Sequence, residues 1–523
     1  MSQLLSQLKL SRTAAVSSLF TLIAIFLTAC GSLTPNLRPM PLMDTRVAPD
    51  IDFQPVNQNN FVTGNQRDQN SSAARTATTM TDGVALLAES AYIDPVIRPF
   101  STAKAYYSIV LKSVSGLFIR TAVDPIRFPL LQQEPVPPLA TNAADMDLVA
   151  WERELDEITG TRTSFGTISY LVDGAEYFPR LVDAINDAED SIDIRTYIFD
   201  SDDVAVKIAD LLKQRSSEVD VKVLVDGLGD LFATNLDSET MPEDFEPPPS
   251  IANYLRSGSK VKVRKQSNPW FTGDHAKSTI IDQKLAFIGG MNIGREYRYD
   301  WHDLMVEVKG PVVDKIQYEF DKVWAKSSLL GDLALFARVI EGYKNNTARQ
   351  GYPIRVLGTT SHNSQIYRSQ LAAIRRAKNH IYIENAYFSD DNVLYELIAA
   401  RRRGVDVRVI VASSGDNATM DMSNEITINT MLRNGIRVYS YPGMTHVKAA
   451  VFDGWACFGS ANFDKLSLQI NQEINLGTSH PQTVKQLVDR VFIPDFAAST
   501  ELRELIPAGW SHRVAEFISD ELL

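Results

Sequence analysis

The chain has 523 residues, of which 44% are hydrophobic and 22% are charged, so it is long enough for two or three globular domains and is not composed like a disordered protein. Its formal net charge is −12. That charge argues against broad nucleic-acid binding, which needs clustered positive charge.

The first 29 residues have the pattern of a secretory leader. Two basic residues, Lys9 and Arg12, precede an apolar stretch, Ala14–Leu27, that is short for a membrane span. We therefore predict a signal peptide over residues 1–29. An ordinary secretory signal or a short anchor helix is the alternative to the lipoprotein signal described next.

The stretch LTACG at residues 27–31 resembles the lipoprotein box of bacteria. This resemblance implies cleavage before Cys30 and lipid attached to that cysteine, which would hold the protein at a membrane surface. Gly31 and Ser32 follow, without the Asp of an inner-membrane retention signal. We therefore expect a lipid-anchored protein, at the outer membrane and facing the periplasm. Cys457 then has no disulfide partner and is expected to pack in a core.

Two segments precede the main globular part of the chain. Residues 30–81 are rich in Pro, Asn, Gln, Ser and Thr, which predicts a flexible tether. Residues 82–150 are expected to form a helical extension followed by a Pro-rich linker. Within it, an apolar stripe at helical spacing fits packing on the catalytic body or contact with lipid, and we predict packing because it is the commoner use. The stripe consists of Tyr106, Ile109, Val110, Val114 and Leu117.

The remainder of the chain repeats itself. Residues 178–199 align with residues 367–388 at a constant shift, and matching helix and strand patterns follow in both copies. We predict a first half over residues 151–345 and a second half over residues 346–523. The fold class expected is α/β, with two similar halves related by a pseudo-two-fold axis. Their sheets should be mixed, mostly parallel and flanked by helices.

Each copy of the repeat ends on a strand with the same pattern, H-x-K-x-x-x-x-D. It reads HAKSTIID at residues 275–282 and HVKAAVFD at residues 446–453. Because side chains alternate along an extended strand, the His and the Lys of each motif should share one face. Ala276 and Val447 should then face a core. An inward His beside a Lys is costly without a negative partner, and a bound phosphate would supply one.

One such motif is a weak signal, whereas two at matching places in an internal repeat are a strong one. The pattern resembles the phospholipase D superfamily across roughly residues 155–523, and within it the bacterial cardiolipin synthases and related phospholipases. Supporting segments are FIGGMNIGREY, AYFSDD, GSANFDKLSLQINQE and W-x-D at residues 301–303. The resemblance implies one active site assembled from both motifs at the interface of the halves.

The residues agree with phosphodiester chemistry. A neutral imidazole can attack phosphorus to form a phosphohistidine, while a second, protonated imidazole donates a proton to the leaving alcohol. Basic and amide groups would hold the non-bridging oxygens, and we expect no cofactor and no metal. The predicted catalytic residues are His275, Lys277, His446, Lys448, Asp303 and Glu473, and the predicted substrate-binding residues are Asn292 and Asn462.

Several of these roles come from the resemblance. Asp303 and Glu473 fit the places of the acids that orient the histidines, with surface carboxylates as the alternative, and Asp282 and Asp453 are implied to be structural. Either histidine attacks in such enzymes, and we expect His275 to be the nucleophile and His446 the acid and base. The remaining histidines are expected to be surface or packing residues: His302, His362, His380, His480 and His512.

Three departures from cardiolipin synthases bear on the acceptor and the membrane rather than on the reaction. One is the lipoprotein signal, which stands in place of the paired membrane helices common in those enzymes. His302 stands where those enzymes usually have the Arg of W-R-D, and Ala386 stands where they usually have the Pro of P-Y-F. The leading hypothesis is a membrane-anchored phosphodiesterase or phosphatidyltransferase acting on phospholipid, by cardiolipin synthase-like transfer or by phospholipase D hydrolysis. The alternatives are a metal-independent endonuclease, which the net charge disfavours, and an inactive surface protein that binds lipid.

Overall fold

A computed structural model describes residues 83–509 and residue 512, except for residues 132–134, 141–143, 234–239, 243, 270–271, 344–345 and 347. The predicted signal peptide, the lipidated Cys30 and the tether over residues 30–81 lie outside these residues.

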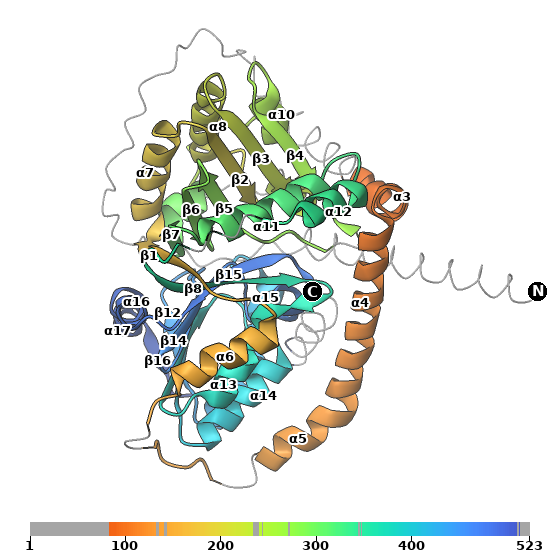
Figure 1. Cartoon of the computed structure of the whole chain (residues 1–523). Helices are drawn as coiled ribbons and strands as arrows, with labels where there is room; N and C mark the ends of the chain where they lie inside the picture. The colour runs from red at the N-terminus through yellow and green to blue at the C-terminus, as the bar shows by residue number, and fades with distance from the viewer. Residues whose placement is uncertain are drawn as a thin grey trace, which may run out of the picture. The chain divides into compact units, whose positions relative to one another are not determined.

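The described chain begins with a run of helices. Its elements are η2 (Glu89–Ile93), α3 (Asp94–Ile97), α4 (Pro99–Phe118), η3 (Ile119–Val123) and α5 (Asp124–Leu131), in which η marks a π-helical turn. Helix α4 runs alongside both halves that follow (Figure 1). The Lys112 ammonium in its middle donates to the carbonyl oxygens of Ser361 and Gln469, in the second half.

Two sets of strands and helices follow in the same order. The first comprises α6 (Leu148–Thr159), β1 (Ser164–Val172), α7 (Asp173–Asn186), β2 (Ser191–Thr196), α8 (Asp203–Arg215), β3 (Asp220–Asp226), α9 (Gly227–Ala233), α10 (Ile251–Arg256), β4 (Lys262–Gln266), β5 (Ser278–Ile281), β6 (Leu285–Gly289), η5 (Glu296–Asp300), β7 (Leu304–Lys309), α11 (Val313–Lys326) and α12 (Asp332–Glu341). The second comprises β8 (Tyr352–Thr360), β9 (Asn363–Ser364), α13 (Gln365–Arg376), β10 (His380–Asn385), α14 (Asp391–Arg402), β11 (Asp406–Ala412), α15 (Ala418–Arg433), β12 (Arg437–Tyr441), β13 (Lys448–Phe452), β14 (Trp455–Gly459), η6 (Leu466–Ile470), β15 (Glu473–Thr478), α16 (Pro481–Leu487), η7 (Val488–Phe492), α17 (Ile493–Ala498) and β16 (Thr500–Leu502).

The strands form one continuous mixed sheet with a symmetric order. From one edge it runs β4-β3-β2-β5-β6-β7-β1, and it continues as β8-β15-β14-β13-β10-β11-β12-β16. The halves join where β1 pairs antiparallel with β8, from Ser164 opposite Ile354 to Gly166 opposite Tyr352. The matching order on both sides of this junction is that of two similar halves about a pseudo-two-fold axis.

The expectation of a mostly parallel sheet is wrong. Among the described strands, only the neighbours β2-β3-β4 and β10-β11-β12 pair in parallel. The motif strands are joined to the next strand by very short turns, and such turns connect antiparallel neighbours. In these turns Asp282, Gln283 and Asp453 have φ values of 52°, 55° and 49°, the left-handed conformation that Asp tolerates better than most residues.

Four groups of buried apolar side chains make up the core of the described residues. One lies within the first half, one joins the second half to Trp151 and Leu155 of α6, a small one contains Tyr387 and Met420, and the fourth contains residues of both halves. Ala276 and Ile280 belong to this shared core, as do Val447 and Val451, so the apolar face expected behind each motif is confirmed. Cys457 is buried in the core of the second half, as expected.

The apolar stripe of the helical extension does not pack on the catalytic body as predicted. Tyr106, Val110, Val114 and Leu117 are exposed, Val114 to 64%. The buried face of α4 consists instead of Thr102, Ala105 and Ser108, small residues that let the helix backbone approach its neighbours closely. Among the helices that the structure describes, none combines the length and the apolar character that a membrane crossing requires.

Candidate active site

The first motif histidine is held by the second half of the chain. His275 lies before β5 rather than within it, in an extended segment whose Asp274 forms an isolated parallel bridge with Gln472. The His275 amide donates to the Gln472 carbonyl oxygen at 2.9 Å, and the Gln472 amide donates to the Gly273 carbonyl oxygen at 2.8 Å. These backbone bonds bring the residue after Gln472, which is Glu473, next to the imidazole.

The second motif histidine is held in the same way by the first half. His446 also precedes its strand, β13, and the neighbouring Thr445 forms an isolated parallel bridge with His302. The His446 amide donates to the His302 carbonyl oxygen at 2.7 Å, and the His302 amide donates to the Met444 carbonyl oxygen at 3.1 Å. The residue after His302 is Asp303, which is thereby placed beside the His446 ring.

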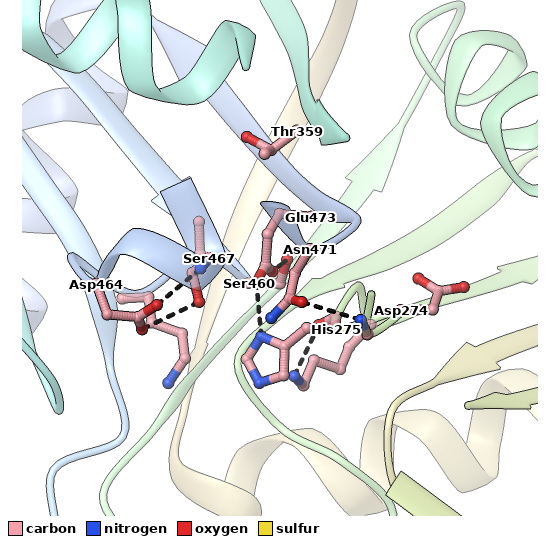
Figure 2. A network of polar contacts seen from close by, with 12 residues as sticks. Asp274, His275, Thr359, Ser460, Asp464, Ser467, Asn471 and Glu473 are labelled. Carbon is pink, nitrogen blue, oxygen red and sulfur yellow. Dashed lines mark hydrogen bonds and ion pairs between the residues drawn. The ribbon is translucent and has the colours of Figure 1, made fainter. Parts of the chain in front are cut away.

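The two orienting acids are exchanged between the halves. Nδ1 of His275 lies 2.9 Å from Oε1 of Glu473, a contact that Figure 2 shows, and Nδ1 of His446 lies 2.6 Å from Oδ2 of Asp303. A carboxylate at Nδ1 fixes the ring and its tautomer and leaves Nε2 for reaction. Each histidine is therefore incomplete without the other half of the chain.

Each motif lysine is oriented by its own histidine. Nζ of Lys277 donates to the His275 carbonyl oxygen, and Nζ of Lys448 donates to the His446 carbonyl oxygen, both at 2.7 Å. The spacing of two residues in an extended segment makes these bonds possible. Both lysines are buried, and burial lowers the pKa of Lys277 to about 7 and that of Lys448 to about 8.

The charged groups of both motifs act on one another. Burial first, and then the charges of both lysines, lower the pKa of each histidine well below its usual value. The pKa of His446 is lowered further by His275. Burial raises the pKa of Asp303 to about 7 and that of Glu473 to about 8, against the lysine charges. The charged groups of the two motifs therefore lie close enough to influence one another electrostatically, and an anion bound between them would favour the charged lysines.

The side chains of the two orienting acids differ in length, and the residues beside them differ as well. The Ser460 hydroxyl donates to Oε2 of Glu473 at 2.5 Å. The matching position in the first half is Gly290, where a Cβ atom would lie only 2.2 Å from Oδ1 of Asp303. Glycine at this position therefore makes room for the carboxylate that faces His446.

The two predicted substrate-binding asparagines have different settings. Oδ1 of Asn292 accepts from the Ile198 amide at 3.1 Å and from the Thr196 hydroxyl at 3.2 Å, and its Nδ2 donates to the Tyr297 hydroxyl at 2.7 Å. Asn292 thus holds Tyr297, and the centroid of the Tyr297 ring lies 5.6 Å from that of the His446 ring. Asn462 is buried, and its Oδ1 has no hydrogen-bond partner in the described structure.

The motif aspartates bind backbone rather than the histidines. The carboxylate of Asp282 accepts from the amides of residues 189–191, which lead into β2. That of Asp453 accepts from the Met146 amide and from the amides of residues 378–380, which lead into β10. Each aspartate ties the turn after its motif strand to the start of the adjacent strand.

His302 was expected to be a surface or packing residue, and the structure corrects this expectation. Nδ1 of the buried ring lies 2.7 Å from Oδ1 of Asp173, and Nε2 lies 3.1 Å from Oδ2 of Asp495 and 3.9 Å from Oε1 of Glu384. Burial alone would lower the pKa of His302, but the hydrogen bonds to Asp173 and Asp495 raise it well above its usual value. The imidazolium therefore joins elements of both halves at the residue whose carbonyl oxygen accepts from the His446 amide.

Among the residues that the structure describes, two groups of side chains have the donor atoms of a cation site. They are His302 with Glu384 and Asp495, and Asp200 with Asp202 and Glu296, each group with its ligand atoms within 4.8 Å of one another. Both already serve the protein: the first as the charged network just described, and the second through Asp202, which caps α8 at the Ala205 amide.

Sequence reasoning also missed two buried aspartates next to the first motif, Asp274 and Asp226. Asp274 is paired with Arg195 of β2, with Oδ1 of the former 2.5 Å from Nη2 of the latter. Oδ2 of Asp226, at the end of β3, accepts from the Asp274 amide at 2.7 Å and from Nδ2 of Asn268 at 2.7 Å. An acid that closes an apolar strand was the available signal for Asp226, since such ends gather polar site residues in α/β folds.

Comparison with known proteins places the site in a family context. Residues 181–324 and 371–493 match the family model described as "Cardiolipin synthase, PLD-like domain". Cardiolipin synthase B of Salmonella typhi is 32% identical over 221 residues, covering 40% of this chain and 53% of the relative. A cardiolipin synthase of Listeria monocytogenes is 32% identical over 240 residues, covering 44% of this chain and 49% of the relative. The chain thus spans about half the length of these curated relatives.

A solved structure has a similar fold. Phosphatidylserine synthase of Haemophilus influenzae Rd KW20 matches with a TM-score of 0.58 over 71% of this chain and 100% of that chain. Its sequence identity is 12%, so the likeness concerns the fold alone.

Proposed function

Because this chain belongs to the phospholipase D superfamily, with two PLD-like regions of the cardiolipin synthase type, we propose that it is a phospholipid phosphodiesterase and phosphatidyltransferase acting through a phosphohistidine. The observation that carries this proposal is the exchange of orienting acids: Glu473 holds His275 and Asp303 holds His446. Two oriented imidazoles beside two buried ammonium groups match the needs of an in-line attack on a phosphodiester.

The first step transfers the phosphatidyl group to the enzyme. Nε2 of neutral His275 attacks phosphorus, and an N–P bond forms as the P–O bond to the leaving alcohol breaks. The negative charge of the bound phosphate favours the protonated form of His446, against the lowered pKa of this group in the free enzyme. Its Nε2 then gives the proton to that alcohol. Lys277 and Lys448 hold the non-bridging oxygens, and the negative charge they contact restores their protonated state.

The second step returns the enzyme to its starting state. Neutral His446 takes a proton from the acceptor hydroxyl, the acceptor oxygen bonds to phosphorus, and the N–P bond to His275 breaks. Asp303 stabilises the imidazolium that forms on His446. With a glycerolipid acceptor the product is a cardiolipin-type lipid, and with water it is phosphatidic acid. The names of the relatives, both cardiolipin synthases, favour transfer to a lipid.

The surroundings of the enzyme form part of this proposal. Lipidation at Cys30 and a position at the outer membrane, facing the periplasm, are supported by the LTACG stretch and by the residues that follow it. An anchored enzyme would meet its substrate at the membrane surface rather than in solution.

Mass spectrometry of lipid products made from defined vesicles tests the proposal. Vesicles would contain labelled phosphatidylglycerol and phosphatidylethanolamine, with the His275→Ala variant as the inactive control. Cardiolipin as product supports transfer, and phosphatidic acid supports hydrolysis. Folded enzyme that turns over neither lipid would refute the proposal, and cleavage of DNA in the presence of a chelator would replace it with an endonuclease.

A further inference from the structure

Large apolar side chains are exposed mainly on two stretches of the described surface. The first runs from η2 through α4 to α5, and the second comprises α12 with its flanking residues. The first stretch exposes Tyr92, Ile93, Val96, Phe100, Tyr106, Tyr107, Val110, Leu111, Val114, Leu117, Phe118, Ile126 and Leu130; the second exposes Leu329, Leu330, Leu333, Phe336, Val339, Ile340 and Tyr343. Both stretches lie outside the residues that match the family model, so the family's catalytic fold does not account for them.

Helix α4 is amphipathic, but its apolar side faces away from the protein, which is the reverse of the usual arrangement on a soluble protein. Its apolar stripe, with Tyr107, Leu111, Val114 and Phe118 at positions i, i+4, i+7 and i+11, points away from the protein. Its inner face is small and polar. At 20 residues the helix is about 30 Å long, and the stripe from Tyr107 to Phe118 covers about 17 Å of it.

Helix α12 extends the same surface. The Phe100 and Phe336 rings meet edge to face with their centroids 5.5 Å apart. The buried Asp332 carboxylate, at the start of α12, accepts from the amides of Phe100 and Ser101 at 2.8 and 2.9 Å and so fixes α4 to α12. Figure 1 shows α12 beside the start of α4. Leu333 and Ile340 are exposed to 71% and 85%, so exposed apolar side chains continue from α4 onto the adjoining α12.

The segment around α4 differs in charge from the whole chain. Residues 95–123 contain four basic residues and no Asp or Glu, although the chain carries a formal net charge of −12. Arg98 is buried against Asp94, and Lys112 donates to carbonyl oxygens of the second half, so Lys104 and the half-buried Arg120 are the basic residues left near the surface. Lys104 is exposed on α4 between the apolar residues. Aromatic and aliphatic side chains combined with basic residues are what an interfacial helix uses to bind an anionic bilayer.

We propose that the α4–α12 face docks on the surface of a bilayer containing anionic phospholipid, with α4 lying in the plane of the interface. No described helix is built to cross a membrane, so the helix lies on the bilayer and does not span it. The inference rests on the proposed function in one respect, because the same surface would then supply the phospholipid substrate. Docking would hold the enzyme at its substrate independently of any lipid on Cys30.

A fluorophore on the face tests the contact directly. In the full chain with Cys30→Ser, which leaves the buried Cys457 as the native thiol, Val114→Cys carries an environment-sensitive label. We expect a blue shift, and quenching by spin-labelled lipid, with phosphatidylglycerol vesicles. The same label at Gln482→Cys, an exposed position on α16, should not respond. No response at position 114, or a blue shift there before vesicles are added, would overturn the proposal; the latter means that another part of the chain or a second copy covers the face.

A pair of variants separates docking from catalysis. Tyr107→Glu with Leu111→Glu places two charges on the exposed stripe and should weaken vesicle binding of the Cys30→Ser chain by about tenfold or more. Gln482→Glu with Gln486→Glu adds the same charge at exposed positions of α16 and should change nothing. The stripe variant should retain wild-type turnover of lipid in detergent micelles. Wild-type vesicle binding by the stripe variant contradicts docking, whereas vesicle binding without any turnover in micelles refutes the proposed function alone.

Discussion

The Nδ1 atoms of His275 and His446 both face carboxylates that come from the opposite half, at 2.9 and 2.6 Å. The reactive Nε2 atoms therefore depend on Glu473 and Asp303 for their tautomer and aim. Both acids are buried, and removing either charge changes which ring nitrogen carries the proton.

Glu473→Gln and Asp303→Asn should each lower kcat by about 10²- to 10⁴-fold, because the amide no longer stabilises an imidazolium. Steady-state turnover of labelled phospholipid measures the effect, and circular dichroism checks the fold. Glu218→Gln, at an exposed carboxylate, serves as the control. Near-wild-type turnover in both variants would show that the acids do not orient the histidines.

Gly290→Ala should disable the His446 side of the site. The added Cβ would lie 2.2 Å from Oδ1 of Asp303, so the carboxylate must move away from the imidazole. We expect kcat to fall by about 10²-fold or more, as for other small displacements of catalytic groups. The matched control is Gly358→Ala, whose Cβ would meet no atom closer than 3.7 Å. Equal kcat values for the two variants would contradict this account of Gly290.

The pH dependence of kcat/KM should report the motif lysines. Burial lowers the pKa of Lys277 to about 7 and that of Lys448 to about 8 in the free enzyme. Deprotonation removes the positive charge that holds the phosphate, whereas Asp303 and Glu473, with pKa values of about 7 and 8, gain their orienting charge over the same range. The two effects oppose each other up to about pH 8, so kcat/KM should fall above that pH, where the lysines are neutral and both acids are already ionised. At saturating substrate the fall in kcat should occur at higher pH than the fall in kcat/KM, because bound phosphate raises the lysine pKa values. A kcat/KM that stays constant to pH 9 would be inconsistent with this role.

The residue types at this site follow from the sequence, but their partners do not. Repeated spacing located His275, Lys277, His446 and Lys448. The exchange of acids is set by backbone pairing between segments far apart in the chain, and no local pattern reports such pairing. His302 was misread for the same reason, since its carboxylate partners come from three distant elements.

At the scale of elements, each motif strand is tied to the strand beside it by its closing aspartate. Asp453 accepts from four backbone amides and Asp282 from three. Asp453 is buried, so its amides have no water as a substitute acceptor, which is a costly loss.

Asp453→Ala should lower the free energy of unfolding by about 2–4 kcal/mol. Asp282→Ala should cost less because its partner amides at residues 189 and 190 lie near solvent. Urea denaturation measures both, with activity per folded molecule followed in parallel. A variant that keeps its stability and loses kcat would mean that the aspartate acts in the chemistry rather than in the fold.

Helix periodicity and strand composition were enough to predict alternating α and β elements in a repeat. They did not reveal that β5-β6-β7 and β13-β14-β15 run antiparallel, because direction depends on the short turns between them. The α4 stripe was detected by its spacing, but spacing alone does not say whether a stripe meets protein or solvent. The small residues Thr102, Ala105 and Ser108 on its other face were the missing signal.

At the scale of the whole molecule, two halves share one sheet, one central core and one set of charges. Residues of both halves make up the core behind the motifs, so the two sides of the site cannot shift independently without cost. The internal repeat predicted two similar halves, and a shared site was implied by the family resemblance; in the structure each histidine faces an acid of the other half.

Trapping of the covalent intermediate tests the central claim most directly. Enzyme mixed with phosphorus-labelled phosphatidylglycerol would be quenched in alkali, which preserves phosphohistidine, and the labelled peptide identified by mass spectrometry. We expect label on His275 in the wild type, none in His275→Ala, and loss of turnover in both His275→Ala and His446→Ala. Lipid turnover that persists in both histidine variants would contradict one site built from the two motifs.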